Sequence, residues 1–380
     1  MTIQTNERAH LLGLLRIKLT LLKKEKLSTN EIYRSLEDWI YNREQAAEIK
    51  EKKMVNSPLI WAGGKSRAMP HVLEALPKGE CLVEPFVGSG SVFLNTDYKT
   101  YILCDSNAAL MNFYSILKRN TEELLDVAAG LFDGGNNEEA YYKCRDEFNG
   151  FNRDFPRHDK KPSDERAYYQ SELIKFAALF LYLNRHCFNG LYRVNGKNEF
   201  NVPFGRRSKP LFPIAEIQYF AKRAYEKGAQ FLCADFRYTI PVASRVFERT
   251  VIYCDPPYLP ASKTADFTAY GKPFTADDHR DLVESLITAH NNEGCVSVFS
   301  GSDTPETRQI YYPFTLNSFE VRRSVGAKSR NLAGEVIGSL RVCDCCGRTG
   351  GGCPDCGAVM GDATYSAMVA SGAFDDLEVF

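Results

Sequence analysis

The sequence predicts an α/β protein with a mostly parallel sheet and a second, mostly helical unit inserted into it. Three observations support this fold. From residue 58 onward, short apolar runs alternate with helix-like patterns, which is typical of strands joined by crossover helices. Glycine or acidic residues follow several of these runs, at the strand ends where open α/β sheets bind ligands. Between two of the runs lies a long segment, residues 118–235, rich in aromatic, Asn and Arg residues and in helical stretches.

The elements follow from local patterns. Residues 1–55 are leucine-rich and then charge-rich, and the capping sequence that begins at Ser28 predicts a helical N-terminal extension. We expect a helix at residues 92–95, a loop at residues 134–137 and a buried helix at residues 176–183. The expected strands lie at residues 81–84, 101–105, 250–253 and 296–299. The expected domains are a core at residues 56–117 and 236–335, an insertion at residues 118–235, and a Cys-rich tail at residues 336–380.

Composition bounds the class of protein. A chain of 380 residues with 44% hydrophobic and 25% charged residues is typical of a soluble globular protein of two or three domains. No apolar run approaches the roughly 20 residues that span a bilayer, and the leucine cluster at residues 11–22 has no cleavage site, so we expect a cytoplasmic protein without a membrane partner. Seven scattered cysteines indicate reduced thiols. Nothing in the sequence indicates an obligate protein partner.

Charge is uneven along the chain. The formal net charge is -1, yet residues 151–230 contain 15 Lys and Arg against 8 Asp and Glu. A basic segment inside a neutral protein is typical of a nucleic-acid contact surface. A solvated basic face is the alternative.

The sequence Asp-Pro-Pro-Tyr at residues 255–258 is the most specific local signal. It follows the expected strand at residues 250–253, which places Asp255 at the carboxyl end of a strand. The two prolines fix the backbone and remove two amide donors, while their carbonyls remain acceptors. Asp255 and a neighbouring carbonyl can thus hold an amino group while Tyr258 stacks on a flat ring. A loop stiffened by prolines is the alternative.

A glycine-rich turn at residues 84–91 follows the first expected strand. It lacks the spacing of a dinucleotide-binding or P-loop motif, which indicates a cofactor without a pyrophosphate. Asp105, at the end of the next strand, is placed to accept hydrogen bonds from a ribose, or else to cap a helix. S-adenosylmethionine, with an adenosine and a cationic sulfur but no phosphate, meets these requirements.

Six motifs in order resemble the Dam family (D12 class) of DNA adenine-N6 methyltransferases, which are encoded by bacteria or phages. They lie at residues 61–65 (Trp-Ala-Gly-Gly-Lys), 83–95, 183–185 (Leu-Asn-Arg), 200–206, 255–258 and 267–270. The resemblance covers residues 58–325. It implies a Rossmann-like S-adenosylmethionine-dependent methyltransferase sheet with an inserted, mostly helical target-recognition domain. The implied activity is methylation of adenine N6 in double-stranded DNA, at GATC or a related site.

The resemblance also implies roles for individual residues. The implied catalytic residues are Asp255, Pro256, Pro257 and Tyr258. The implied cofactor-binding residues are Trp61, Lys65, Phe86, Gly88, Asp105 and Asp255. The implied DNA-binding residues are Phe188, Asn189, Leu191, Arg193, Pro203 and Arg206. Arg193 would read guanine, Leu191 and Pro203 would contact thymine, and Phe188 would enter the DNA as a wedge.

One position departs from the family. Ile60 stands where a relative carries a DNA-contacting lysine, and isoleucine cannot make that contact. The resemblance therefore supports recognition of the outer guanine less well than recognition of guanine by Arg193. Without the resemblance, Trp61, Phe188 and Leu191 would be core residues, Lys65 would be a solvated cation, and Arg206 would form a surface salt bridge.

The expected reaction requires the adenine to leave the duplex, because N6 is out of reach within the base stack. We expect Asp255→Ala to abolish methylation while leaving the fold intact. A DNA-binding regulator that has lost catalysis and a cytosine-N4 methyltransferase are the competing readings, and RNA is the least favoured substrate.

Five cysteines crowd into residues 343–356. Cys343, Cys346, Cys353 and Cys356 form two Cys-x-x-Cys-Gly knuckles whose spacing suits a structural zinc site. The six-residue spacer is short for a zinc ribbon, so a redox pair or a disordered tail is the alternative.

Overall fold

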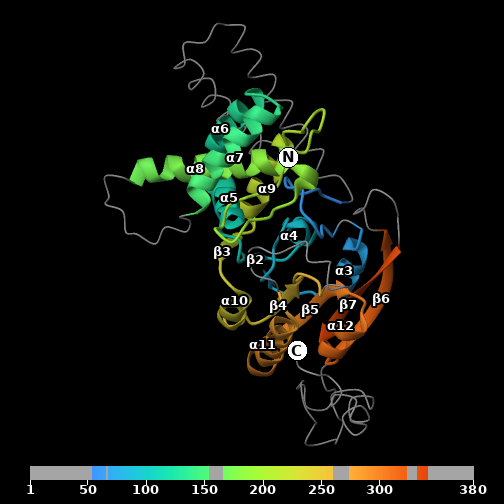
Figure 1. The fold of residues 1–380 in the computed structure, drawn as a ribbon. Helices are drawn as coiled ribbons and strands as arrows, with labels where there is room; N and C mark the ends of the chain where they lie inside the picture. Colours follow the sequence, from blue (N-terminus) through green and yellow to red (C-terminus); the bar gives the residue numbers. More distant parts are fainter. Residues whose placement is uncertain (1–53, 66, 154–165, 260–273, 323–331, 341–380) are drawn as a thin grey trace, which may run out of the picture.

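A seven-stranded sheet forms the centre of the described structure (Figure 1). The computed structural model describes residues 54–65, 67–153, 166–259, 274–322 and 332–340. The strands are β1 (Cys81–Glu84), β2 (Thr100–Asp105), β3 (Gln230–Cys233), β4 (Thr250–Cys254), β5 (Val296–Ser302), β6 (Phe314–Arg322) and β7 (Leu332–Leu340). Their order is β3-β2-β1-β4-β5-β7-β6. The first five are parallel, and β7 runs antiparallel between β5 and β6.

The central strands bury both faces, which explains their continuous apolar runs. All four residues of β1 and all five of β4 are buried. Because successive side chains alternate across a sheet, Leu82 joins one hydrophobic cluster while Cys81 and Val83 join another on the opposite face. The sheet therefore separates two cores.

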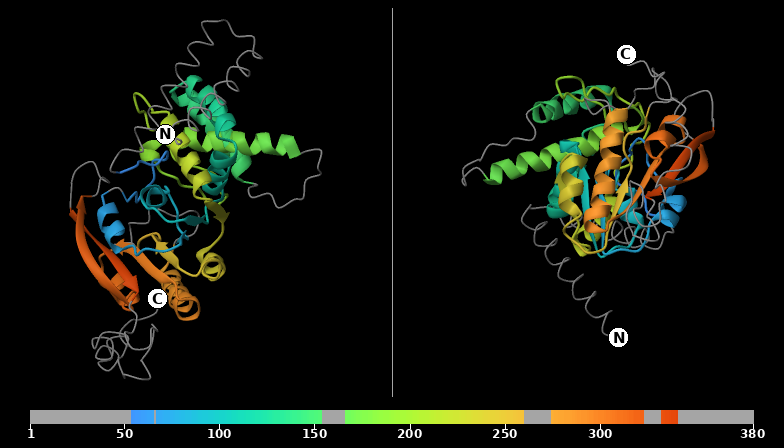
Figure 2. Two further views of the ribbon diagram at one scale, coloured as in Figure 1. Left: turned by 180° about the vertical axis from the view of Figure 1, so that it is seen from behind. Right: turned by 90° about the horizontal axis from the view of Figure 1, so that it is seen from below.

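Helices cover both faces of the sheet (Figure 2). The longer ones are α5 (Ala108–Arg119), α6 (Thr121–Asp133), α7 (Glu138–Asn152), α8 (Arg166–His186), α9 (Ile214–Glu226), α10 (Phe236–Ala243) and α11 (Ala276–Glu293). The shorter ones are α3 (Met69–Ala75), α4 (Ser91–Asn95), α12 (Pro305–Ile310) and the 3-10 turn η2 (Phe188–Gly190). Buried residues of α5, α8 and α9 belong to the first cluster, and those of α10 and α11 to the second. The sheet is thus doubly wound, as the alternating sequence pattern predicts.

The helices between β2 and β3 do not form a separate core. Apolar residues of α6, α7 and α8 share one hydrophobic cluster with Leu82 of β1 and Tyr253 of β4. β3 falls inside the segment expected to be the insertion, yet it pairs in parallel with β2 at the edge of the sheet. The sheet thus includes part of residues 118–235, and it also extends past residue 335, because β7 ends at Leu340.

Several expected elements lie in the described part of the chain. The expected loop at residues 134–137 separates α6 from α7, and residues 176–183 are buried within α8. Residues 1–53 of the expected N-terminal extension and the four cysteines Cys343, Cys346, Cys353 and Cys356 lie outside the described residues. Within the described ranges, no helix has the length and apolar character needed to cross a membrane.

Candidate functional site: a carboxylate and a glycine turn at adjacent strand ends

Asp255 follows β4 directly and lies in an ion pair with Lys65. The Nζ atom of Lys65 is 2.6 Å from Oδ2 of Asp255, and the Lys65 side chain is 6% exposed. Lys65 also donates to the carbonyl of Gly63 at 3.0 Å. Burial lowers the pKa of Lys65, but Asp255 and Tyr258 together outweigh burial and raise it above the ordinary 10.5. Lys65 therefore stays protonated in its buried position because Asp255 and Tyr258 stabilise its charge.

The other carboxylate oxygen of Asp255 is held from the sheet. Ser300, on β5, donates to Oδ1 of Asp255 at 2.9 Å. The hydroxyl of Tyr253 lies 2.8 Å from Oγ of Ser300, and both side chains are buried. Tyr253, Ser300 and Asp255 therefore form a chain of hydrogen bonds that fixes the carboxylate at the carboxyl end of β4. The sequence alone gave no signal for the part played by Ser300.

Tyr258 closes this side of the site. Nζ of Lys65 lies 5.0 Å from the centroid of the Tyr258 ring, within the range of a cation–π contact. Pro256 is buried, and Pro257 and Tyr258 are half-buried. Asp255 and Tyr258 thus both contact the Lys65 ammonium group.

The glycine-rich turn lies beside Asp105, as the sequence predicts for a nucleotide site. Gly88 follows β1 with a φ of 47°, and its N–H donates to Oδ2 of Asp105 at 3.2 Å. The N–H of Asn107 donates to the other oxygen at 3.0 Å. Burial raises the pKa of Asp105 to about 6, although the N–H groups of Asn107, Gly88 and Ser106 oppose the rise. Asn107, and not Asp105, caps α5.

Trp61 packs against the same turn. A Cβ atom on Gly88 would lie 3.2 Å from the Trp61 indole, so glycine permits this close approach. The Trp61 ring stacks on Tyr192 at a centroid distance of 6.1 Å. Phe86, by contrast, turns to the opposite core, where it contacts Phe236 at 5.6 Å. Trp61, Gly88 and Asp105 therefore lie together, while Phe86 packs on the core at the other face of the sheet.

The residues expected to contact DNA lie on one segment after α8. Phe188, Asn189, Arg193, Pro203 and Arg206 are exposed, whereas Leu191 is half-buried. The N–H of Phe188 donates to the carbonyl of Pro203 at 2.9 Å, which brings the two parts of the segment together. Nε of Arg193 donates to Oδ1 of Asn201 at 2.7 Å. Arg206 has a φ of 51° and lies 3.5 Å from Glu138.

Asn184 joins this segment to the loop that carries Trp61 and Lys65. It accepts from the N–H of Ile60 at 2.9 Å and donates to the carbonyl of Ile60 at 2.7 Å. It also donates to the carbonyl of Gly190 at 3.3 Å. A Cβ atom on Gly190 would lie 2.4 Å from Cγ2 of Ile60. Asn184, from the Leu-Asn-Arg motif, therefore holds the segment expected to contact DNA directly against Ile60.

The comparisons with known proteins identify the family of this chain. The model of the D12 class N6 adenine-specific DNA methyltransferase family matches residues 61–325. The chain belongs to this family. A "DNA adenine methylase" from Serratia marcescens is 41% identical over 278 residues, which cover 73% of this chain and 93% of that protein. The proteins of that name from Escherichia coli strain K12 and Vibrio cholerae strain N16961 are 42% and 41% identical and are covered over 88% and 91% of their lengths.

The enzyme is thus an adenine-specific DNA methyltransferase, and membership of the family implies the use of S-adenosylmethionine. The match indicates adenine as the target base and argues against a cytosine-N4 methyltransferase. Among the residues that the structure describes, no group of three or more His, Cys, Asp and Glu side chains is arranged to hold a metal ion.

Glu84 of the methyltransferase provides a test of whether the site fits this cofactor. The residue ends β1 and is 1% exposed, and Oε1 has no hydrogen-bond partner among the described atoms. Burial raises the pKa of Glu84 to about 8, and the nearby Asp255 adds to this rise. A buried carboxyl oxygen without a donor is costly, so it indicates a place for a ligand donor. The ammonium group of S-adenosylmethionine is such a donor, and Asp105 suits the ribose hydroxyls.

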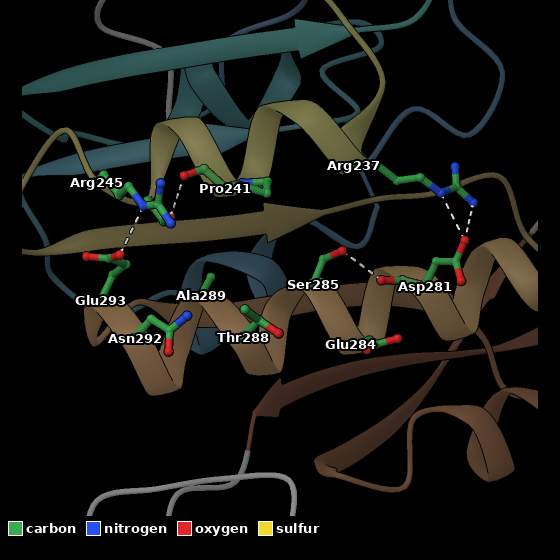
Figure 3. A pocket seen from close by; sticks show the side chains of 11 residues that line it. Arg237, Pro241, Arg245, Asp281, Glu284, Ser285, Thr288, Ala289, Asn292 and Glu293 are labelled. Atoms are coloured by element: carbon green, nitrogen blue, oxygen red, sulfur yellow. Dashed lines mark hydrogen bonds and ion pairs between the residues drawn. The ribbon is translucent and has the colours of Figure 1, made fainter.

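A groove in the methyltransferase lies away from these residues. It has a volume of about 300 Å³ and lies between α10 and α11. Ion pairs bridge it at both ends, with Arg245 opposite Glu293 and Arg237 opposite Asp281 (Figure 3). None of the predicted site residues lines this groove. Its ion pairs tie α10 to α11.

Proposed function

We propose that this enzyme transfers a methyl group from S-adenosylmethionine to N6 of adenine in double-stranded DNA, at GATC or a related site. One observation carries the proposal. The carboxylate of Asp255 is fixed by Ser300 and Lys65 at the end of β4, next to the strand whose end forms the Gly88 turn. This arrangement supports a role for Asp255 in holding the substrate and for the neighbouring turn in binding the nucleoside of the cofactor.

Trp61, Lys65, Phe86, Gly88, Asp105 and Asp255 are the residues proposed to hold the cofactor. When bound, S-adenosylmethionine supplies a methyl group on a cationic sulfur. Asp105 is already oriented by two backbone N–H groups, and each carboxylate oxygen keeps a further lone pair for a ribose hydroxyl. Asp255 would provide negative charge for the cationic sulfur, and Lys65 forms the ion pair that orients this carboxylate.

The target adenine is proposed to rotate out of the duplex and enter the site between Asp255 and Tyr258. Asp255 and the carbonyl of Pro256 would accept the two hydrogens of the adenine amino group, while Tyr258 stacks on the base. The two accepted hydrogen bonds turn the lone pair of N6 out of the plane of the base. Asp255 or water takes the proton that N6 loses. Because the chemistry is a single displacement, holding the amine in the correct orientation supplies much of the rate.

The exposed segment around Arg193 is proposed to read the DNA sequence. Arg193 can form paired hydrogen bonds with O6 and N7 of guanine. Asn201 orients the guanidinium group, because its Oδ1 accepts from Nε at 2.7 Å and its backbone carbonyl accepts from one outer amino group at 3.4 Å. Leu191 and Pro203 suit the methyl group of thymine, and the exposed Phe188 suits a wedge between base pairs. Arg206 and Asn189 suit the phosphate backbone.

Two measurements test the proposal. DNA from cells that lack adenine methylation but express this protein should resist an endonuclease blocked by GATC methylation. Transfer of a tritiated methyl group to a GATC duplex should fall to background when the adenine is replaced by 2-aminopurine, which lacks the 6-amino group. Methylated DNA that remains cleavable at GATC would refute the proposed site, and the absence of any N6-methyladenine would refute the proposed reaction.

The zinc site remains a separate proposal, supported by cysteine spacing alone. We propose that Cys343, Cys346, Cys353 and Cys356 bind one zinc ion through thiolates. Metal analysis of the purified full chain should find about one zinc per molecule, and the Cys346→Ser variant should lose it. A chain that retains no zinc after purification in a metal-replete medium would refute this assignment.

A further inference from the structure

His279, on the first turn of α11, contacts the Asp-Pro-Pro-Tyr loop from behind. Its Nε2 atom lies 3.1 Å from the carbonyl oxygen of Pro257, and its Nδ1 atom lies 2.8 Å from the hydroxyl of Tyr311. Because a carbonyl oxygen only accepts, Nε2 carries the hydrogen and Nδ1 accepts from Tyr311. Burial lowers the pKa of His279 to about 4, although the bond to Pro257 opposes the shift. The imidazole is therefore neutral near pH 7, in one tautomer.

The loop depends on such a donor because of its own sequence. Pro256 and Pro257 have no N–H groups, so the loop can be anchored there only through its carbonyls or side chains. The ring of Pro257 fixes φ. A hydrogen bond to the Pro257 carbonyl fixes ψ, which is the remaining free torsion of that residue. That torsion sets the position of Tyr258 relative to the carbonyl of Pro256.

Contacts of helix α11 and of Phe274 hold the His279 imidazole in place. Thr275 and Asp278 form a capping box that begins α11, and Arg237 of α10 lies 2.6 Å from Asp278. The groove between α10 and α11 shows the companion contact between Arg237 and Asp281 (Figure 3). The edge of Phe274 meets the His279 ring at a centroid distance of 4.8 Å.

Tyr311 is equally constrained. Its ring stacks on Phe299 of β5 at a centroid distance of 3.7 Å, and the residue is 1% exposed. The line of contacts from β5 through Tyr311 and His279 to Pro257 is therefore made of buried groups with fixed orientations.

We propose that His279 and Tyr311 are positioning residues for methyl transfer, which hold Tyr258 and the Pro256 carbonyl in the relative orientation that grips the adenine. The inference rests on the proposed function of Asp255 to Tyr258. Neither residue touches the substrate. They act through the backbone of Pro257, and they set the geometry in which the amine is held.

Three variants separate this role from a general loss of structure. His279→Leu removes the donor, His279→Gln keeps both a donor and an acceptor, and Tyr311→Phe removes only the hydroxyl that selects the tautomer. His290→Leu is the matched control. His290 lies on the same helix and also contacts a backbone carbonyl, that of Cys295 at 2.8 Å, but far along α11 from the loop.

The readout is the single-turnover rate of methyl transfer to duplex DNA, with the fraction of active enzyme and the KM for the cofactor measured alongside. We expect His279→Leu to lower the rate constant between about tenfold and a hundredfold, with the cofactor KM changed less than about twofold. His279→Gln should recover most of the rate, Tyr311→Phe should lower it, and His290→Leu should leave it unchanged. A merely structural role would reduce the active fraction and not the rate constant.

The inference is overturned if His279→Leu folds and keeps a rate constant within about threefold of the wild type. If His279→Leu does not fold, the rate constants of Tyr311→Phe and His279→Gln test the positioning role instead. An unchanged rate in Tyr311→Phe, or a rate in His279→Gln as low as in an Asp255→Asn variant, refutes the inference. A wild-type enzyme that transfers no methyl group to adenine would instead refute the proposed function.

Discussion

Replacing Asp255 by alanine removes the anion that neutralises a buried cation, as well as the group proposed to hold the substrate. Breaking a buried ion pair by removing one partner costs about 3–5 kcal/mol. We expect about 3 kcal/mol here, because the Asp255 side chain is 21% exposed whereas that of Lys65 is 6% exposed. The carbonyl of Gly63 also remains as an acceptor for Lys65 in the variant. The structure thus replaces the expectation of an unaffected fold with a measurable loss of stability.

The pH dependence identifies the cause. In the wild type, the pKa of Lys65 is raised above its ordinary 10.5, so its contribution to stability is fully present below pH 10.5 and is lost only at higher pH. Without Asp255, the effect of burial dominates and lowers that pKa. The unfolded chain then binds more protons than the folded chain as the pH approaches about 10. The stability of Asp255→Ala should therefore rise with pH, whereas this group gives the wild type no such slope.

Urea unfolding of the full chain at about pH 7 and pH 9 measures both effects. The double variant Lys65→Met/Asp255→Ala should recover most of the stability, because it removes the stranded cation, yet it should still lack methyl transfer. Asp281→Ala is the control, since its pair with Arg237 is exposed and should cost about 1 kcal/mol or less. If Asp255→Ala is as stable as the wild type at both pH values, the ion pair has no structural role and the reasoning is wrong.

Three further predictions concern single residues. Asn184→Ala should lower the free energy of unfolding by about 2–4 kcal/mol, because three hydrogen bonds to Ile60 and Gly190 are lost. Urea titration measures this loss. We also expect the variant to bind the cofactor more weakly. Glu84 has its pKa raised from 4.5 to about 8, so the folded chain binds more protons and its stability falls as the pH rises through this range. Glu84→Gln should abolish that part of the slope in unfolding experiments at several pH values. Gly190→Ala should lower the melting temperature, because it adds a Cβ atom 2.4 Å from Ile60 at a φ of 66°, whereas Gly196→Ala, with open space around it, should not.

The sequence predicts the strands whose residues are buried on both faces. β1 lies at the expected residues 81–84, and β4 and β5 begin where the apolar runs begin. β3 is different, because it is a short strand at the edge of the sheet, where Gln230, Leu232 and Cys233 are exposed, and it lies inside the segment expected to be an insertion. The antiparallel strands β6 and β7 also gave no clear signal. Gly338 of β7 lies against Phe299, where a Cβ atom would approach to 2.3 Å, so this pairing depends on tertiary contacts.

The candidate site shows the same division. Asp255, Gly88 and Asp105 belong to motifs at strand ends, and their arrangement follows from the order of parallel strands. Ser300 and His279 could not be predicted in this way. Each is a common residue inside a strand or helix, and its partner lies 45 or 22 positions away in the chain. Only the packing of α11 and β5 around the loop reveals what these two side chains hold.

Ile60 connects the segment proposed to contact DNA with the loop that carries Trp61 and Lys65. Ile60 cannot make the polar contact of a lysine, but its backbone is paired with Asn184 and its side chain packs on Gly190. Trp61 follows it directly and stacks on Tyr192, the neighbour of Arg193. Ile60 therefore lies between the segment proposed to read the bases and the loop proposed to bind the cofactor. We therefore expect a substitution of Ile60 to change DNA recognition and cofactor binding together, and its effect on sequence preference is best measured at saturating cofactor.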